Sequence, residues 1–194
     1  MLEGKTLTNY PEKLEYFISK WKPQTLHSPP LHTTNEKSRR RRKMYGEWEI
    51  FAAVIARNKG RFLIVRERRT GSHRGGWSIP GGAVEKGERV EAGAIREARE
   101  EAGISVKLLR PTALLTMTIK APTEENLEYA LALFNARITG GSMVPSDKKE
   151  IAEARLANRD EIELLIRNGQ FPRMHSNIDK SIAGFFRKVA DLKN

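Results

Sequence analysis

The chain has 194 residues, 39% of them apolar, a length that suits one ordinary domain with extensions. It contains no cysteine, which excludes disulfides, thiolate nucleophiles and thiolate metal sites, so any metal must be held by Asp, Glu, His or carbonyl groups. The net charge of +11 favours negatively charged partners such as nucleotides or nucleic acids without choosing between them.

The first 46 residues are predicted to form a basic N-terminal extension, which carries +6 of the net charge. Residues 11–21 have apolar side chains at helical spacing, which predicts a short amphipathic helix that docks on its own domain or on a partner. Residues 22–43 contain three prolines and end in a basic run, and we predict a linker there. The chain has neither an apolar run long enough to cross a membrane nor a recognisable signal peptide, so we expect a cytoplasmic protein without membrane contact.

The run Arg39–Arg42 has three interpretations. It is a solvated part of the linker, a clamp for nucleic-acid phosphates, or a targeting or partner-docking segment. No aromatic residues are interleaved with these arginines to stack on bases, so the solvated linker is favoured.

Residues 47–194 are predicted to form a layered α/β (α+β) domain, because strand and helix patterns alternate along them. The apolar runs Ile50–Ala56 and Arg61–Arg66 flank a turn at residues 58–60 and predict a β-hairpin. Further strands are expected at 77–79, 105–118 and 128–139, and helices at 88–102, 160–167 and 178–192. Asn158 or Asp160 is expected to cap the second of these helices.

Three carboxylates lie on one face of the helix predicted at 88–102. Glu97, Glu100 and Glu101 are spaced i, i+3 and i+4, where like charges oppose helix formation by about 0.2–0.5 kcal/mol per pair. They also lie near the helix C-terminus, where the dipole is already negative. Such a cluster of hard oxygen donors suits Mg²⁺ or Mn²⁺. A solvated acidic face, eased by Arg96 and Arg99, is the alternative.

The segment Gly82–Ile104 resembles the signature of the Nudix hydrolases without a gap. The signature is Gly, five residues, Glu, seven residues, Arg-Glu, an apolar residue, any residue, Glu-Glu, any residue, Gly and an apolar residue. The matching positions are Gly82, Glu88, Arg96, Glu97, Ala98, Glu100, Glu101, Gly103 and Ile104. Ala98 is smaller than the aliphatic residue usual there. The similarity covers about residues 47–171 and implies the Nudix fold, a mixed β-sheet between helices.

This resemblance implies a magnesium-dependent (or manganese-dependent) pyrophosphohydrolase. Its divalent ions are expected to be bound by Glu97, Glu100 and Glu101, together with the carbonyl of Gly81 or Gly82. Glu100 and Glu101, the final pair of the signature, are the first candidates for catalytic roles.

Other roles follow from the same resemblance. Arg96 and Glu88 are expected to support the site through ion pairs rather than to touch substrate. The general base is expected to be Glu101 in the helix or Glu150 in the downstream loop, with Glu153 a third candidate.

Substrate contacts are expected just before the glycine turn at residues 75–76. The basic residues there would bind phosphates through charge-assisted hydrogen bonds, and they are Arg66, Arg68, Arg69, His73 and Arg74. An exposed basic loop is an equal alternative for each of them. Trp77 would stack on a base, but packing in the core is favoured for it.

The sequence leaves the substrate open. A nucleoside triphosphate, or a nucleoside diphosphate derivative such as ADP-ribose or a sugar nucleotide, is expected. An RNA 5′-end pyrophosphohydrolase would unite the basic extension with the catalytic helix. A non-catalytic nucleotide-sensing module is the remaining alternative, and the retained glutamates argue against it. A homodimer is compatible with the sequence.

Overall fold

The computed structural model describes residues 10–45, 48–68 and 75–171. The chain divides into two compact units, which are described in turn. Unit 1 comprises residues 1–54, 81–96 and 108–135, and unit 2 comprises residues 55–80, 97–107 and 136–194. None of the described helices combines the length and the apolar character that crossing a membrane requires.

In unit 1 a mixed sheet has the strand order β1-β7-β8-β3. It contains β1 (Thr25–His27) and the unit 1 parts of β7 (Ile104–Lys120), β8 (Leu127–Gly141) and β3 (Trp48–Asn58). β1 and β2 (Leu31–His32) run parallel to β7, whereas β6 (Gly81–Ala83) is antiparallel to β3. The long strands correspond to the predicted ones and extend beyond their predicted ends.

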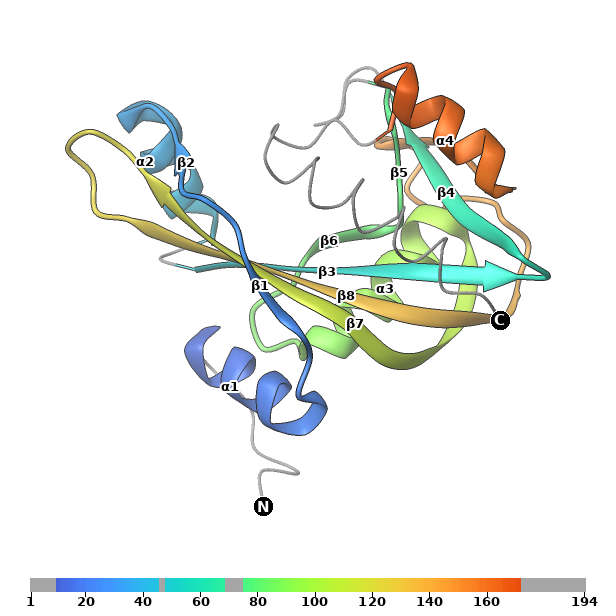
Figure 1. Cartoon of the computed structure of the whole chain (residues 1–194), viewed down its shortest axis with the longest axis horizontal. Helices are drawn as coiled ribbons and strands as arrows, with labels where there is room; N and C mark the ends of the chain where they lie inside the picture. Colours follow the sequence, from blue (N-terminus) through green and yellow to red (C-terminus); the bar gives the residue numbers. More distant parts are fainter. Residues whose placement is uncertain (1–9, 46–47, 69–74, 172–194) are drawn as a thin grey trace. The chain divides into compact units, whose positions relative to one another are not determined.

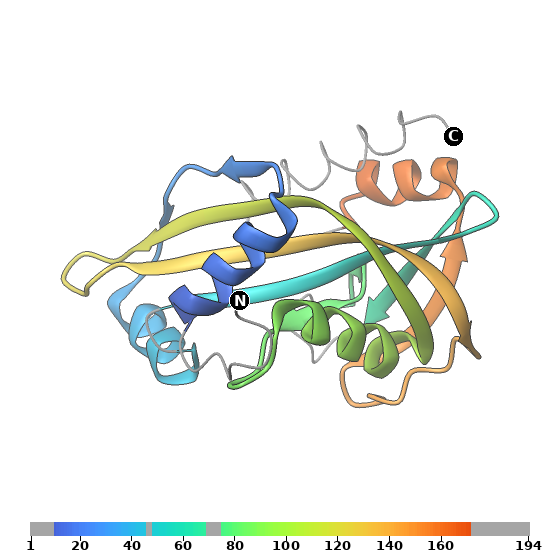
Figure 2. The same ribbon diagram turned by 90° about the horizontal axis from the view of Figure 1, so that it is seen from below.

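Helix α1 (Tyr10–Trp21) confirms the predicted amphipathic helix. It lies against β7 and β8, as Figures 1 and 2 both show. Leu14 and Phe17 are buried, and the rings of Phe17 and Trp21 lie edge-on to Phe134 of β8 at 5.5 and 6.2 Å between centroids. The apolar face of this helix is therefore part of the core of unit 1.

The prediction of a linker at residues 22–43 is wrong. This stretch contains β1 and β2, both paired with β7, and the start of helix α2 (Asn35–Tyr45). The prolines lie outside the helix, before or between the short strands, where extended backbone suits them. The strands were missed because their partner strand is about 90 residues away along the chain, in register Thr25↔Leu114.

The arginines of α2 are largely paired within the chain. Arg41 donates to Glu49 at 2.6 Å, and the side chains of Arg39 and Arg42 lie 3.6 Å from the carboxylates of Glu124 and Glu125. Arg42 also donates to the backbone carbonyl of Glu125 at 2.9 Å. These pairs account for an unusually basic helix that packs on its own unit, and they weaken the interpretation of the run as a nucleic-acid clamp.

In unit 2 the strand order is β3-β4-β5, and β9 pairs with β4. β4 (Arg61–Glu67) forms the predicted hairpin with the end of β3, with Arg57 opposite Phe62. The turn places Lys59 and Gly60 at positive φ, the conformation that a tight hairpin requires. β5 (Trp77–Ser78) confirms the short strand predicted there.

Strand β9 (Ile151–Ala157) corrects the prediction of a loop in this region. It runs antiparallel along β4 from Phe62↔Ala157 to Glu67↔Ile151, with an irregularity at Arg66 and Glu67. Ala152, Ala154 and Leu156 alternate with Glu153 and Arg155, but the strand is short and its pairing with the distant β4 was not visible locally.

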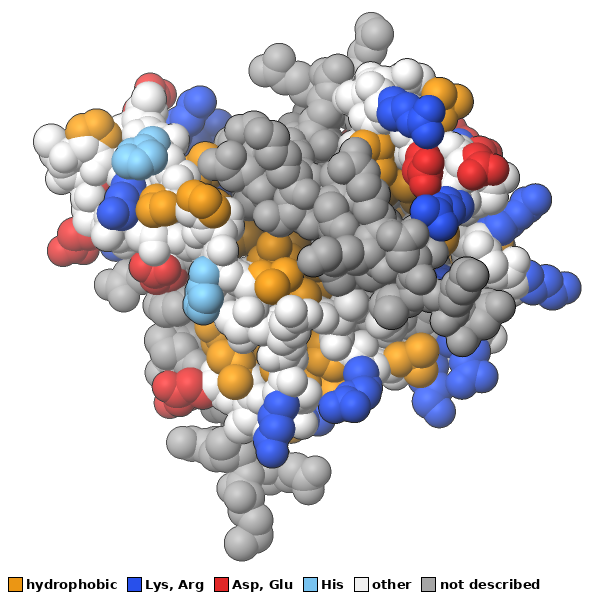
Figure 3. Space-filling view, viewed as in Figure 1, with side chains coloured by type: hydrophobic (Ala, Val, Ile, Leu, Met, Phe, Trp, Pro, Cys, Tyr) orange, Lys and Arg blue, Asp and Glu red, His pale blue; other side chains and the backbone are white. Residues whose placement is uncertain are grey.

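Helix α4 (Arg159–Arg167) begins at Asn158, which confirms one of the two predicted caps. The Asn158 side chain accepts from the backbone of Glu161, and the Glu161 side chain accepts from the backbone of Asn158. Lys and Arg side chains lie among Asp and Glu side chains over this helix (Figure 3), where Arg159 and Arg167 both pair with Glu163. The helix predicted at 178–192 lies outside the described residues. The domain boundary after residue 46 stays a prediction.

Candidate active site

The loop that leads into the signature helix is held close to β3 in unit 1. Ala53 pairs with Gly81 and Ala52 with Gly82. A Cβ atom on Gly81 would lie 2.4 Å from the Ala53 Cβ and 2.8 Å from the Ala52 carbonyl oxygen. Val84 then donates to the carbonyl of Ile50 at 2.8 Å. Only glycine at residue 81 lets β6 approach β3 this closely.

Glu88 and Arg96, the two residues expected to support the site, form an ion pair with each other. Arg96 Nε lies 3.0 Å from Glu88 Oε1, and its Nη2 lies 3.1 Å from Oε2. The same Nη2 donates to the Ala83 carbonyl at 2.8 Å, while Glu88 Oε2 accepts from the Glu85 amide at 2.9 Å. The pair thus ties the middle of helix α3 (Val90–Ala102) to residues 83–88, an arrangement that suits the predicted supporting role.

The three signature carboxylates lie on the unit 2 part of α3. Glu97 is buried with 9% of its surface exposed, and Glu100 and Glu101 are half-buried. Ala98, the small residue of the signature, is fully buried. Gly103 ends the helix at φ +63, the left-handed conformation expected of a C-terminal glycine, and its amide donates to Arg99 at 2.9 Å.

Residues 142–147 cap the end of α3. The Glu100 carbonyl accepts from the amides of Ser146 and Asp147 at 2.9 and 3.0 Å, and Ser142 donates to the Gly103 carbonyl at 3.2 Å. A Cβ atom on Gly103 would lie 2.0 Å from the Val144 carbonyl oxygen. These contacts satisfy carbonyls that a helix end leaves unpaired, and they fix the loop that leads to Glu150.

Glu150 lies at the surface in a turn organised by Asp147. The Asp147 carboxylate accepts from the amides of Lys149 and Glu150 at 3.0 and 3.1 Å. The Glu150 carbonyl accepts from the Arg68 amide at 2.7 Å, and Arg68 Nε donates to the Lys148 carbonyl at 2.7 Å. Of the predicted phosphate ligands, Arg68 is thus engaged with this turn. Arg69, His73 and Arg74 lie outside the described residues.

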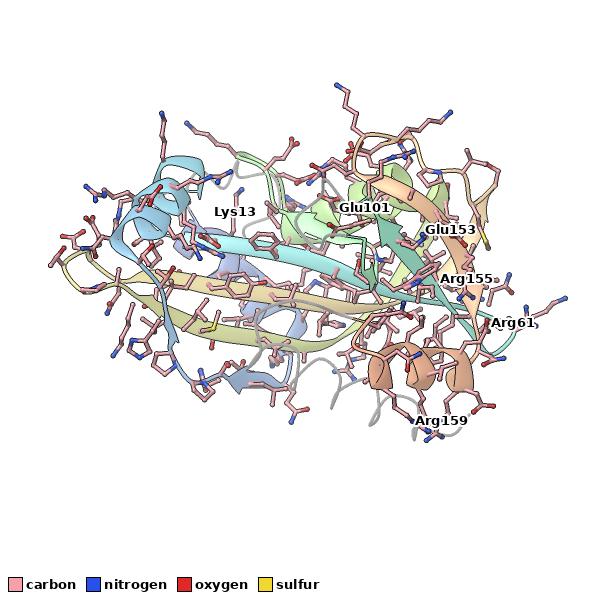
Figure 4. All side chains as sticks on the ribbon, turned by 90° about the horizontal axis from the view of Figure 1, so that it is seen from above. Lys13, Arg61, Glu101, Glu153, Arg155 and Arg159 are labelled. Carbon is pink, nitrogen blue, oxygen red and sulfur yellow. The ribbon has the colours of Figure 1, made fainter. Side chains whose placement is uncertain are left out.

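Arg66 and Glu153 form an ion pair beside Trp77. Figure 4 labels Glu153 and Arg155 on β9 and Glu101 on α3. Arg66 Nη2 lies 3.0 Å from Glu153 Oε2, and Arg155 Nε lies 3.7 Å from Glu153 Oε1. The guanidinium carbons of Arg66 and Arg155 lie 5.7 and 4.6 Å from the centre of the Trp77 ring. Trp77 is buried, as the core interpretation expected, and its ring is covered by cations.

The donor set fits a hard divalent cation, since the expected ligands are carboxylate and carbonyl oxygens. Across residues 10–45, 48–68 and 75–171, however, no three His, Asp or Glu side chains are gathered closely enough to hold a metal. Glu97, Glu100 and Glu101 all have other interactions in this structure. Their role as ligands, together with Gly81 or Gly82, stays a prediction.

Comparison with known proteins identifies the family. The model of the NUDIX domain matches residues 48–177, and the chain therefore belongs to the Nudix family. The structure of a NUDIX hydrolase from Nitrosomonas europaea superposes with a TM-score of 0.57 at 21% identity, over 77% of this chain and 76% of that one. The predicted mixed α/β fold is confirmed by this likeness.

Three curated relatives are similar to parts of the chain. A MutT-like protein of Streptomyces ambofaciens is 33% identical over 50% of this chain and 51% of its own length. A CMP-5'-(N-acetyl-N-hydroxy-3-aminopropyl)phosphonate hydrolase of Streptomyces rubellomurinus is 31% identical over 60% and 54%. A putative 8-oxo-dGTP diphosphatase 3 of Mycobacterium tuberculosis is 30% identical over 52% and 46%. The chain spans about half the length of these relatives. Two of these relatives are named as enzymes, a hydrolase and a putative diphosphatase.

Proposed function

We propose that the chain hydrolyses a diphosphate linkage in a nucleotide with the help of Mg²⁺ or Mn²⁺. The observation that carries this proposal is the intact signature in a member of the Nudix family: its Arg–Glu pair is formed, and its three further glutamates lie on one helix. The paired residues, Glu88 and Arg96, join the loop to the helix. A binding module would have no need to keep all three remaining carboxylates.

The proposed division of labour follows from the chemistry of phosphates. A divalent ion held by Glu97, Glu100 and Glu101 offsets phosphate charge and lowers the pKa of a bound water. A carboxylate then accepts the water's proton. Glu101 and Glu150 are the proposed bases. Glu153 is a weaker candidate because it already pairs with Arg66 and Arg155.

The proposed substrate is a nucleoside triphosphate or a nucleoside diphosphate derivative. Two of the relatives are named for such molecules, one for 8-oxo-dGTP and one for a CMP phosphonate. A nucleotide with linked phosphoryl groups is the chemistry they share. Arg66 and Arg68 are proposed to meet the phosphates, which requires each to exchange its present partner for substrate.

Cleavage of 5′-triphosphorylated RNA is the second candidate, and the observations favour it less. This hypothesis requires the arginines of Arg39–Arg42 to be available for RNA phosphates, whereas three of them contact Glu side chains of their own unit. Contact with nucleic acid and formation of a homodimer thus remain proposals with weaker support than the small-nucleotide reaction.

The test is a panel of substrates incubated with the full chain and Mg²⁺, with EDTA as the paired condition. The panel holds nucleoside and deoxynucleoside triphosphates, including 8-oxo-dGTP, then ADP-ribose, sugar nucleotides and 5′-triphosphorylated RNA, with products separated by chromatography. Turnover of one small-nucleotide class that stops with EDTA supports the proposal and names the substrate. Turnover of RNA alone would select the second candidate. Tight nucleotide binding with no turnover would indicate a sensing module.

A further inference from the structure

A lysine of the N-terminal helix binds the signature loop. Lys13 of α1 is 2% exposed, and its Nζ donates to the Glu85 carbonyl at 2.6 Å. The amide of the same residue, Glu85, donates to Glu88 Oε2 at 2.9 Å. The backbone of Glu85 is thus held on one side by the signature's own glutamate and on the other by a side chain 72 residues earlier.

The position of Lys13 suits this role electrostatically. Burial lowers the pKa of the Lys13 ammonium group, and the negative charge of Glu88 opposes that effect. A buried amine is costly unless it is hydrogen-bonded and near an opposite charge. The Glu85 carbonyl supplies the hydrogen bond, and Glu88, which also binds Arg96, supplies the charge.

Helix α1 is also fixed to the beginning of α3, which keeps Lys13 in place. Lys20 Nζ and Trp21 Nε1 both donate to Glu91 Oε1 at 2.8 Å. Burial would raise the pKa of Glu91, but these two hydrogen bonds bring it below its usual value. The guanidinium of Arg89 lies 5.4 Å from the centre of the Tyr16 ring. Two parts of α1, about two turns apart, therefore hold the loop and the helix start separately.

We infer that Lys13 is a positioning residue of the active site and that α1 belongs to the catalytic apparatus rather than to an appended extension. Lys13 fixes the loop of residues 83–88, which connects the predicted metal-binding glycine turn to α3. It acts through the Glu85 backbone and the Glu88–Arg96 pair and does not touch substrate. The inference rests on the proposed hydrolase function for its kinetic consequence, but its structural consequence is independent of activity.

The test replaces Lys13 with methionine, which keeps an unbranched stem and removes both the charge and the N–H donors. Lys37→Met on the exposed side of α2 is the matched control. The readouts are kcat and KM on the substrate found by the panel, and amide hydrogen exchange by mass spectrometry. We expect kcat to fall about tenfold with KM changed less than about twofold, in line with losses of about 10–100-fold when groups supporting ligands are removed. Exchange in residues 83–91 should accelerate at least about tenfold, with β8 unchanged.

Several outcomes would overturn the inference. Exchange in the loop that stays at the wild-type rate, or a faster loop with unchanged kcat, would leave Lys13 a residue of the fold only. If Lys13→Met does not fold, Lys20→Met removes one of the two donors to Glu91 at a partly exposed side chain, and it should produce a smaller acceleration in residues 83–91. Absence of that acceleration would also contradict the inference. A wild-type chain without turnover would defeat the proposed function, while the exchange data would still decide on the positioning of the loop.

Discussion

At the scale of single residues, Gly81 sets how closely the signature loop approaches β3. Replacing Gly81 with alanine would place a methyl group 2.4 Å from the Ala53 Cβ, and the nearby Ala52 carbonyl cannot move without breaking strand pairing. We expect a loss of about 1–3 kcal/mol in the free energy of unfolding, as for other overpacked sites. Urea denaturation of Gly81→Ala and wild type measures this loss in the free energy of unfolding. Gly140→Ala is the control, because a Cβ there meets nothing within 4 Å. Equal midpoints for the two variants would refute this explanation.

Arg41 compensates a buried carboxylate. Glu49 has a fully buried side chain whose Oε2 binds Arg41, while its Oε1 has no hydrogen-bond partner in the described structure. Arg41→Met leaves that charge without its guanidinium partner, and we expect the free energy of unfolding to fall by about 3 kcal/mol. This value is at the lower end for broken buried ion pairs, because the Arg41 side chain is 27% exposed. Arg39→Met is the control. Its side chain is 67% exposed and its pair with Glu124 is long, so its loss should be small.

The effect of Arg41→Met should depend on pH in a defined direction. Burial raises the pKa of Glu49 above its ordinary value of 4.5, with Arg41 acting against the rise. A raised folded-state pKa gives stability that is complete below the unfolded pKa and is lost as pH rises through the folded value. Removing Arg41 raises that folded pKa further. The deficit relative to wild type should therefore be largest at neutral pH and shrink toward pH 4.5. A deficit that grows on acidification would contradict this.

At the scale of elements, local patterns were sufficient where neighbours in sequence are neighbours in space. The β3–β4 hairpin, α1 and α4 were predicted because their turn and cap residues lie beside them, as Asn158 does. β1 and β9 were missed because each is stabilised by a strand far away in the chain. β1 and its neighbour β2, also missed, have three and two residues, too few for an alternating pattern of their own, so tertiary pairing decides their conformation.

In the candidate site, too, residues within the local signature were predicted, and residues whose partners are distant in sequence were missed. The resemblance to the signature singled out Glu88 and Arg96 as supporting residues, and the structure shows that these two residues, eight apart, pair with each other. Nothing in the sequence around Lys13 distinguished it from other lysines, because its partner lies 72 residues away. Arg155 was missed together with β9, although it covers the Trp77 ring more closely than Arg66 does.

The start of α4 offers a prediction at this scale. Asn158→Ala removes the side chain that accepts from the Glu161 amide at 2.9 Å. We expect a loss of about 1 kcal/mol in stability, the usual cost of an N-cap. Asp160→Ala, at the alternative cap position of the sequence, should cost less because its carboxylate acts only on the helix dipole. Thermal unfolding of both variants checks the order, and a reversed order would place the cap at Asp160.

At the scale of the whole molecule, several arginines among the described residues are paired with carboxylates of their own unit. Arg39, Arg41 and Arg42 contact glutamates in unit 1, and Arg159 and Arg167 pair with Glu163 in unit 2. These five arginines are a small part of the 35 Lys and Arg residues, so the net charge of +11 resides largely on others. The pairing of Arg39, Arg41 and Arg42 therefore argues against a dedicated nucleic-acid arm at this run, while the net charge still favours anionic substrates.

The central claim is that the carboxylates of α3 carry out metal-dependent hydrolysis of a nucleotide diphosphate. The most direct test is kcat/KM at saturating Mg²⁺ for wild type, Glu101→Gln and the control Arg99→Gln, which alters an exposed residue of the same helix. We expect Glu101→Gln to lose at least about 10²-fold, the contribution typical of a general base, with Arg99→Gln close to wild type. Wild-type turnover in Glu101→Gln would contradict the account.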